Sequence, residues 1–119
     1  MAKGFLIAAI AALAISTPVF AGDVATLVNL GFSADSSYFM FGQYGVATGT
    51  GTPWAEAFLV DTRKNAFVTG GSVHKDFDAR LEAGQDASGA FYSLFAAQTA
   101  IAAKYRIDHL KPGRLLYVL

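Results

Sequence analysis

The sequence predicts a small α+β protein made of an antiparallel β-meander, one C-terminal amphipathic helix and a final short strand. Between residues 24 and 82, alternating or wholly apolar stretches are separated by short turns rich in Gly, Ser, Thr, Asn and Asp, which is the pattern of consecutive strands. From residue 88 to residue 105, apolar residues recur at intervals of three and four among many alanines, as expected for a helix. Strands joined by short connections usually pair with each other, so a meander is the simplest topology.

The first 21 residues have the three parts of a secretory signal peptide. Lys3 supplies the positive charge, residues 5–15 form an uncharged apolar run, and Ala21 places a small residue before the expected cleavage site. The apolar run is too short to cross a bilayer as a mature helix. We therefore expect cleavage between Ala21 and Gly22, the alternative being a buried N-terminal helix.

Cleavage would leave residues 22–119 as a single small domain, secreted or periplasmic, with no stable membrane anchor. The chain has nine basic and nine acidic residues, so removing Lys3 leaves a net charge of about −1. This balance argues against a nucleic-acid partner, which would favour clustered Lys and Arg. Cysteine is absent, which excludes disulfides and thiolate metal ligands. We expect no cofactor.

The N-terminal half of the domain begins with two predicted strands. Residues 24–32 alternate between apolar and polar positions, and residues 33–37 are Ser and Asp rich, as in a turn. Residues 38–41 are apolar at every position, which indicates a strand covered from two sides. We interpret Gly42 and Gly45 as residues that relax this strand near its end.

Three further segments continue the predicted meander. After a Gly- and Thr-rich loop over residues 46–53, residues 54–61 form a third strand and residues 67–69 a short fourth one. Residues 73–82 fit two patterns, because their apolar residues match both a strand face and helical i, i+4 spacing. We favour the strand.

The predicted helix over residues 88–105 can be capped by Asp86 or Ser88. We expect it to pack on the sheet rather than on a membrane surface, because it lacks the basic residues of interfacial helices. Residues 115–119, Leu-Leu-Tyr-Val-Leu, then form the final strand. Since this apolar run lacks a polar tail, we expect it to need further chain or a partner strand beside it, as in a truncated domain.

Two segments resemble known repeats. Residues 31–35, Gly-Phe-Ser-Ala-Asp, and residues 58–61, Phe-Leu-Val-Asp, are similar to the strand pattern of TolB-type β-propeller repeats. A propeller closes only with four or more blades, and residues 22–119 are too few for that. The resemblance therefore implies a hairpin and not a propeller.

The chain as a whole resembles a family of predicted secreted bacterial proteins of unknown function, over most of positions 23–118. The stretches that carry this resemblance are 32–33, 38–45, 59–61, 84–86, 88–90, 107–110 and 112–114. Members of that family are longer than this chain. The resemblance implies export, but no biochemical role follows from it.

Two sets of residues could carry chemistry. Ser33 lies in a sequence close to the Gly-x-Ser-x-Gly nucleophile motif, and with Asp35 and either His74 or His109 it could form a hydrolase triad. The strand–turn–strand context instead favours a simple turn.

His74, Asp76 and Asp78 alternate and could share one strand face, as metal ligands would. A solvated polar face explains the same pattern, because one imidazole and an Asp-x-Asp pair are an incomplete ligand set. We expect neither catalytic residues nor a metal site.

The leading hypothesis is an exported, non-catalytic binding or interaction domain of the cell envelope, whose partner is a protein or another envelope component. The alternative is a small secreted hydrolase that uses Ser33, Asp35 and a histidine.

Overall fold

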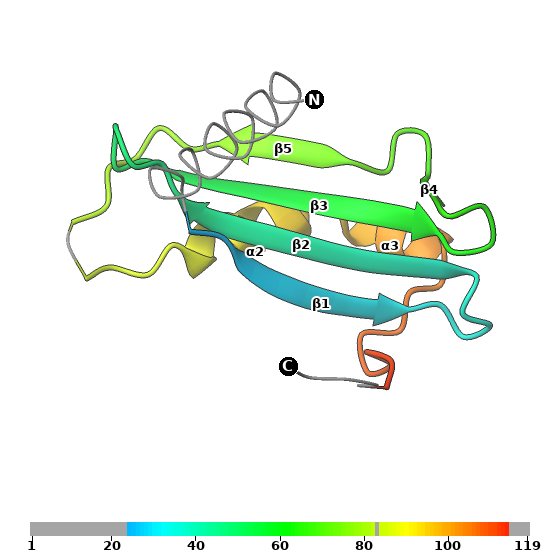
Figure 1. Ribbon diagram of the computed structural model, residues 1–119. Helices are drawn as coiled ribbons and strands as arrows, with labels where there is room; N and C mark the ends of the chain where they lie inside the picture. Colours follow the sequence, from blue (N-terminus) through cyan, green and yellow to red (C-terminus); the bar gives the residue numbers. More distant parts are fainter. Residues whose placement is uncertain (1–23, 83, 115–119) are drawn as a thin grey trace, which may run out of the picture.

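The computed structural model describes residues 24–82 and 84–114, and shows one antiparallel sheet with two short helices on one face (Figure 1). In chain order the elements are β1 (Thr26–Phe32), β2 (Tyr38–Val46), β3 (Pro53–Asp61), β4 (Ala66–Phe67), β5 (Val73–Asp76), α2 (Ser88–Ala96) and α3 (Thr99–Lys104). The predicted α+β class is confirmed.

The sheet is a meander of β1, β2 and β3, and two short strands, β4 and β5, lie next to β3. β1 pairs with β2 and β2 with β3, while β4 and β5 both pair with β3. Between them the chain bulges at Gly70 and Gly71, where the Leu59 N–H donates to the Gly71 carbonyl (3.1 Å) and the Val68 N–H donates to the Leu59 carbonyl (2.9 Å). The sequence favours a strand over a helix for residues 73–82, and the structure has a strand there, β5, which ends at Asp76.

β2 is longer than the sequence predicts. It runs through Gly42, opposite Ala57, and Gly45, opposite Trp54, to Val46. Gly45 lies near the end of the strand as predicted, but Gly42 lies in its middle, so the interpretation is wrong for Gly42. A Cβ atom at Gly42 would lie 2.3 Å from Cε2 of Phe91, so this glycine makes room for a ring of the helical layer.

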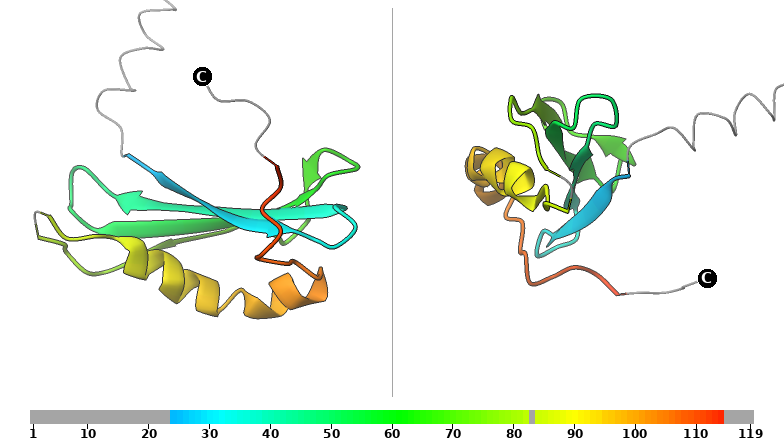
Figure 2. Two further views of the ribbon diagram at one scale, coloured as in Figure 1. Left: turned by 90° about the horizontal axis from the view of Figure 1, so that it is seen from below. Right: turned by 90° about the vertical axis from the view of Figure 1, so that its left-hand side faces the viewer.

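The core lies between the sheet and α2 (Figure 2). Phe91 and Leu94 are each only 3% exposed, and they face a sheet surface that contains the fully buried Met40 and Leu59. Phe95, by contrast, is half-buried and packs on Phe91 with ring centroids 5.9 Å apart.

The single predicted helix is two helices. At the end of α2 the Ala97 N–H donates to the Leu94 carbonyl and the Gln98 N–H to the Phe95 carbonyl. These i→i−3 bonds tighten the last turn, and the chain restarts as α3 at Thr99. The N-cap residue of α2 is Ala87, not Asp86 or Ser88 as predicted, and it makes no side-chain cap hydrogen bond. The Asp86 carboxylate, one residue earlier, accepts the Ser88 N–H at 2.8 Å.

Both helices of the described residues, α2 and α3, lie on the same face of the sheet (Figure 2). The sequence predicts that residues 38–41 are covered from two sides, whereas the described helices cover them from one side. Met40 is fully buried beneath the helical layer, whereas Phe39 and Phe41 are half-buried on the other face.

Two predictions lie outside the described residues. These are the signal peptide, with its cleavage site between Ala21 and Gly22, and the final strand over residues 115–119. Among the described residues, neither helix has the length and apolar character needed to cross a membrane.

Replacing Phe91 with Ala should lower the free energy of unfolding by about 3–5 kcal/mol, because the change leaves a cavity in the centre of the core. Tyr92→Ala is the matched control, since the neighbouring Tyr92 is 69% exposed, and should change stability by less than about 0.5 kcal/mol. Urea unfolding of the three proteins measures both values. Equal losses in the two variants would contradict the packing of α2 on the sheet.

Candidate functional site

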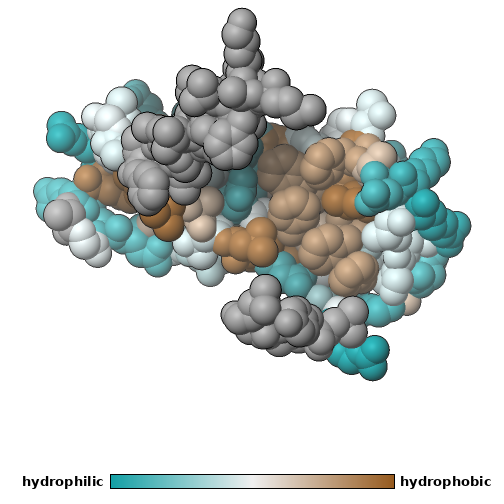
Figure 3. Space-filling view, in the orientation of Figure 1, coloured by the Kyte–Doolittle hydropathy of each residue, from teal (hydrophilic) through white to brown (hydrophobic). Residues whose placement is uncertain are grey.

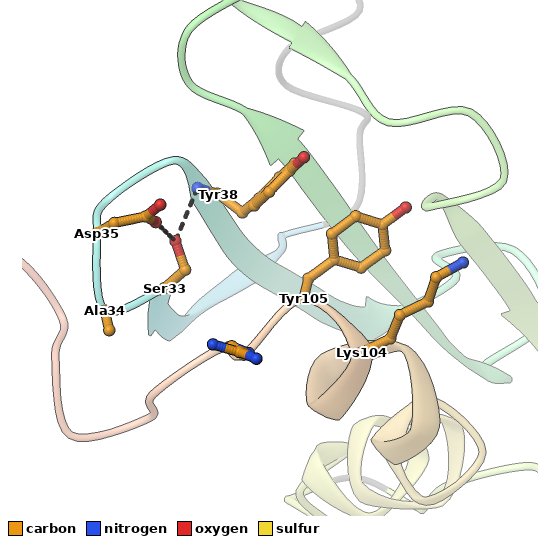
Figure 4. A pocket seen from close by; sticks show the side chains of 7 residues that line it. Ser33, Ala34, Asp35, Tyr38, Lys104 and Tyr105 are labelled. Carbon is orange, nitrogen blue, oxygen red and sulfur yellow. Dashed lines mark hydrogen bonds between the residues drawn. The ribbon is translucent and has the colours of Figure 1, made fainter.

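Ser33, the predicted nucleophile, lies in the turn between β1 and β2 (Figure 4). Its side chain is buried, and its Oγ atom donates to Asp35 Oδ1 (2.9 Å) and accepts the Tyr38 N–H (3.0 Å). Ser36 completes the turn with a φ of 62°. The hydroxyl group therefore holds the turn together, as the strand–turn–strand context predicts.

Asp35 is an ionised turn residue. Its carboxylate accepts the Ser37 N–H (3.0 Å) as well as the Ser33 hydroxyl. Together with the Ser37 hydroxyl and the nearby Arg63, these contacts lower the pKa of Asp35 from 3.8 to about 2, and the Ser37 backbone bond has the largest effect. In the part of the chain that the structure describes, no histidine is hydrogen-bonded to this carboxylate, so it does not have the role of a triad acid.

An open cleft of about 410 Å³ lies between this turn and the end of α3 (Figure 4). Besides the turn residues it is lined by Tyr38, Lys104, Tyr105 and Arg106. The rings of Tyr38 and Tyr105 meet edge to face at 4.8 Å, and the Lys104 ammonium lies 5.5 Å from the Tyr105 ring centroid. The lining holds cations, hydroxyl groups and the Asp35 carboxylate, whose low pKa makes it a weak base for Ser33, and it contains no histidine.

The two histidines have other contacts. His109 Nδ1 lies 2.6 Å from the Leu30 carbonyl oxygen, and because a carbonyl can only accept, Nδ1 carries the proton. His74 lies 3.0 Å from Asp76 and 3.4 Å from Glu56. Its hydrogen bond with Asp76 raises the pKa of the imidazole. Within the described residues, neither ring is hydrogen-bonded to Ser33.

The second predicted set is only partly brought together. His74 and Asp76 are in contact on β5, while Asp78 follows the end of that strand. Residues 24–82 and 84–114 contain no group of three or more His, Asp or Glu side chains that could hold a metal ion. The polar residues of β5 thus form a charged, exposed strand.

The open face of the sheet carries a feature that sequence reasoning missed. Five phenylalanine rings form a continuous row across four strands, with successive centroids 4.5–5.8 Å apart. We call this row, Phe32, Phe39, Phe41, Phe58 and Phe67, the phenylalanine face. Figure 3 shows it as part of an apolar surface on the side away from the helices.

The strand register builds this row. Phe32 lies opposite Phe39, and Phe41 lies opposite Phe58, so rings from neighbouring strands meet in pairs. Four of the rings are half-buried, and Phe67 at the end of the row is 59% exposed. The signal in the sequence was the phenylalanine at every second position of residues 39–41, which places both rings on one face.

A sheet with helices on one face and an apolar aromatic row on the other defines a small two-layer α+β domain. Residues 40–119 match the family model described as "Predicted secreted protein (DUF2259)". Since this match covers more than half of the chain, the protein belongs to this family of predicted secreted proteins of unknown function. The comparisons with curated proteins and with solved structures gave no match. The resemblance to TolB-type repeats is not supported by these comparisons.

The pKa of Asp35 predicts acid sensitivity of the β1–β2 turn. Because the pKa is about 2 in the folded protein and 3.8 as the unfolded reference, ionised Asp35 stabilises the fold above pH 3.8 and loses this effect as the pH falls towards 2. In Asp35→Asn this contribution to the pH dependence should disappear. Unfolding of both proteins in urea between pH 2 and pH 6 measures the difference. A slope between pH 4 and pH 2 that is identical in both proteins would contradict the assignment.

Proposed function

We propose that this protein is an exported, non-catalytic binding domain of the cell envelope that acts in the periplasm or outside the cell, and that it binds through the phenylalanine face. The observation that carries the proposal is the row of five rings on a sheet face that neither described helix covers. Exposed apolar rows of this kind are typical of interaction surfaces.

The chemistry of the row indicates the kind of partner. Full burial of one Phe side chain contributes about 1.5–3 kcal/mol. Covering the parts of the rings that are still exposed, the largest being at Phe67 (59% exposed), would therefore contribute free energy to binding. The rings form a row across neighbouring strands on one face of the sheet. An apolar segment of a protein, laid across the strands, would contact several rings at once, whereas a small polar ligand would find few hydrogen-bonding groups.

The hydrolase alternative has less support. Ser33 is buried and hydrogen-bonded within its turn, and His74 and His109 have carboxylate and carbonyl partners elsewhere. A nucleophile needs an adjacent base that can accept its proton. The Asp35 carboxylate is within hydrogen-bonding reach of the Ser33 hydroxyl, but its pKa of about 2 makes it a weak base, and no histidine lines the cleft.

Capture from an envelope fraction tests the binding surface. The exported protein and Tyr92→Ser should capture the same components, whereas Phe67→Ser should capture at least about tenfold less. A tenfold loss is expected when the removed ring contributes about 1.4 kcal/mol or more to the binding free energy. Tyr92 is the matched control because it is an aromatic residue of similar exposure, 69% against 59%, on the helical layer. Equal capture by the two variants would contradict binding through the phenylalanine face.

A screen of ester substrates tests the alternative. The proposal predicts that neither the exported protein nor Ser33→Ala hydrolyses p-nitrophenyl esters above the rate of buffer alone. Hydrolysis by the unaltered protein that is lost in a folded Ser33→Ala variant would overturn the non-catalytic function.

A further inference from the structure

A bulge in β1 fixes a histidine beside the helical layer. The register of β1 with β2 shifts between Asn29 and Gly31, so Leu30 is the extra residue of the bulge. Such a residue has no partner in the ladder, and the Leu30 carbonyl instead accepts a hydrogen bond from His109 Nδ1 at 2.6 Å. A side chain at Gly31, whose φ is 104°, would collide with the Asp108 carbonyl. The backbone beside His109 therefore lies directly on the bulge and holds the imidazole in place.

The bond to Leu30 uses only one of the two ring nitrogens of His109. Among the residues that the structure describes, Nε2 has no hydrogen-bond partner. The ring of Phe95 meets the imidazole edge to face, with centroids 5.3 Å apart. Because Nδ1 donates to the carbonyl, Nε2 is an acceptor in the neutral ring and a second donor in the imidazolium. A ligand could therefore bond to Nε2 without breaking the contact that holds the ring.

His109 also lines an apolar groove of about 390 Å³ between β1 and the helices. α2 packs over β2 and β3, and Val28, on the helical face of β1, is only half-buried. We call this hollow the β1–α2 groove; its lining includes Val28, Leu30, Phe91, Phe95, Ala96 and His109. No Asp, Glu, Lys or Arg side chain of the described residues belongs to the lining.

This combination of groups indicates the kind of ligand. Small-molecule sites are typically apolar pockets of about 300–1,000 Å³ with a few polar groups that fix the orientation of the ligand. The groove offers apolar surface to a hydrocarbon chain and one nitrogen to a head group. A carboxyl group complements Nε2 well, because it can give its proton to the imidazole and then pair with it as a carboxylate. Charge-assisted hydrogen bonds of this kind are stronger than neutral ones.

We propose that the β1–α2 groove binds a fatty acid, with the acyl chain against Phe91 and Phe95 and the carboxyl group hydrogen-bonded to Nε2 of His109. One proton lies between the two groups, and the bound pair carries no net charge whichever group holds that proton. The groove is on the helical side of the sheet, opposite the phenylalanine face (Figure 2). The proposal therefore does not rest on the binding function proposed for that face.

Calorimetric titration with decanoic acid and with methyl decanoate tests the head group. The exported protein should bind the acid at least about tenfold more tightly than the ester, because the ester has neither an acidic proton nor a charge to pair with the imidazole. In His109→Ala this preference should be lost. His74→Ala is the matched control and should keep the preference, since His74 lies on β5 in contact with Asp76 and outside the groove.

Two alanine positions test the location of the chain. Ala96 is exposed at the end of α2 and lines the groove, so Ala96→Leu should partly fill it and weaken binding of the acid at least about tenfold. Ala103→Leu is the matched control, because Ala103 is an exposed alanine of α3 outside the lining. In the unaltered protein, each CH₂ group added between octanoic and decanoic acid should strengthen binding about fourfold.

Loss of the acid preference in His109→Ala, together with weaker binding by Ala96→Leu than by Ala103→Leu, supports the proposal. Any one of three results would overturn it: no binding by the unaltered protein, equal affinity for acid and ester, or equal affinity in the two leucine variants. His109→Gln, whose amide can still donate to the Leu30 carbonyl, replaces His109→Ala if circular dichroism shows that the alanine variant is unfolded. None of these changes touches the phenylalanine face, so the result is independent of the capture experiment.

Discussion

The contact of the Phe91 ring with the backbone of Gly42 determines how closely the two layers of this protein approach. A single methyl group at position 42 would lie 2.3 Å from that ring and 2.8 Å from the Glu56 carbonyl oxygen. The neighbouring strand β3 also has small residues in this core, Ala55 and Ala57, and both are fully buried. Small residues in the sheet thus let a short helix bury its large ones, and a domain of this size obtains a dense core without disulfides.

The opposite face of the sheet has the reverse composition. There the large side chains belong to the strands, and Phe41 and Phe58 stack with centroids 5.0 Å apart. Because side chains alternate along a strand, Met40 faces the helices while its neighbours Phe39 and Phe41 face away. One sheet therefore supplies a closed core and an open apolar surface, and the second surface is where the candidate function resides.

Much of the fold could be predicted from local patterns, because alternation and turn chemistry depend on neighbouring residues. The turn at residues 33–37, held by the side chains of Ser33 and Asp35, is an example. What could not be predicted depends on contacts distant in sequence. Gly42 resembles a strand terminator unless Phe91 is known to lie above it.

The candidate site follows the same rule. Ser33, Asp35 and the histidines suggested a triad by residue type, but only the three-dimensional arrangement assigns His109 to the Leu30 carbonyl. The phenylalanine row needs the register of four strands, since its members are up to 35 positions apart. The expectation that residues 38–41 are covered from both sides depends on the other layer of the protein, and the two described helices lie on one face only.

The edges of the sheet also limit how this protein can associate. On one side, the Phe32 N–H and carbonyl are already bonded to residues 108–111. On the other, the strand position is interrupted at Gly70 and Gly71, and β5 exposes His74, Lys75 and Asp76. Occupied, broken and charged edges discourage the addition of foreign strands and growth into fibrils. A protein that is exported without disulfides can in this way keep an apolar sheet surface while resisting edge-to-edge polymerisation.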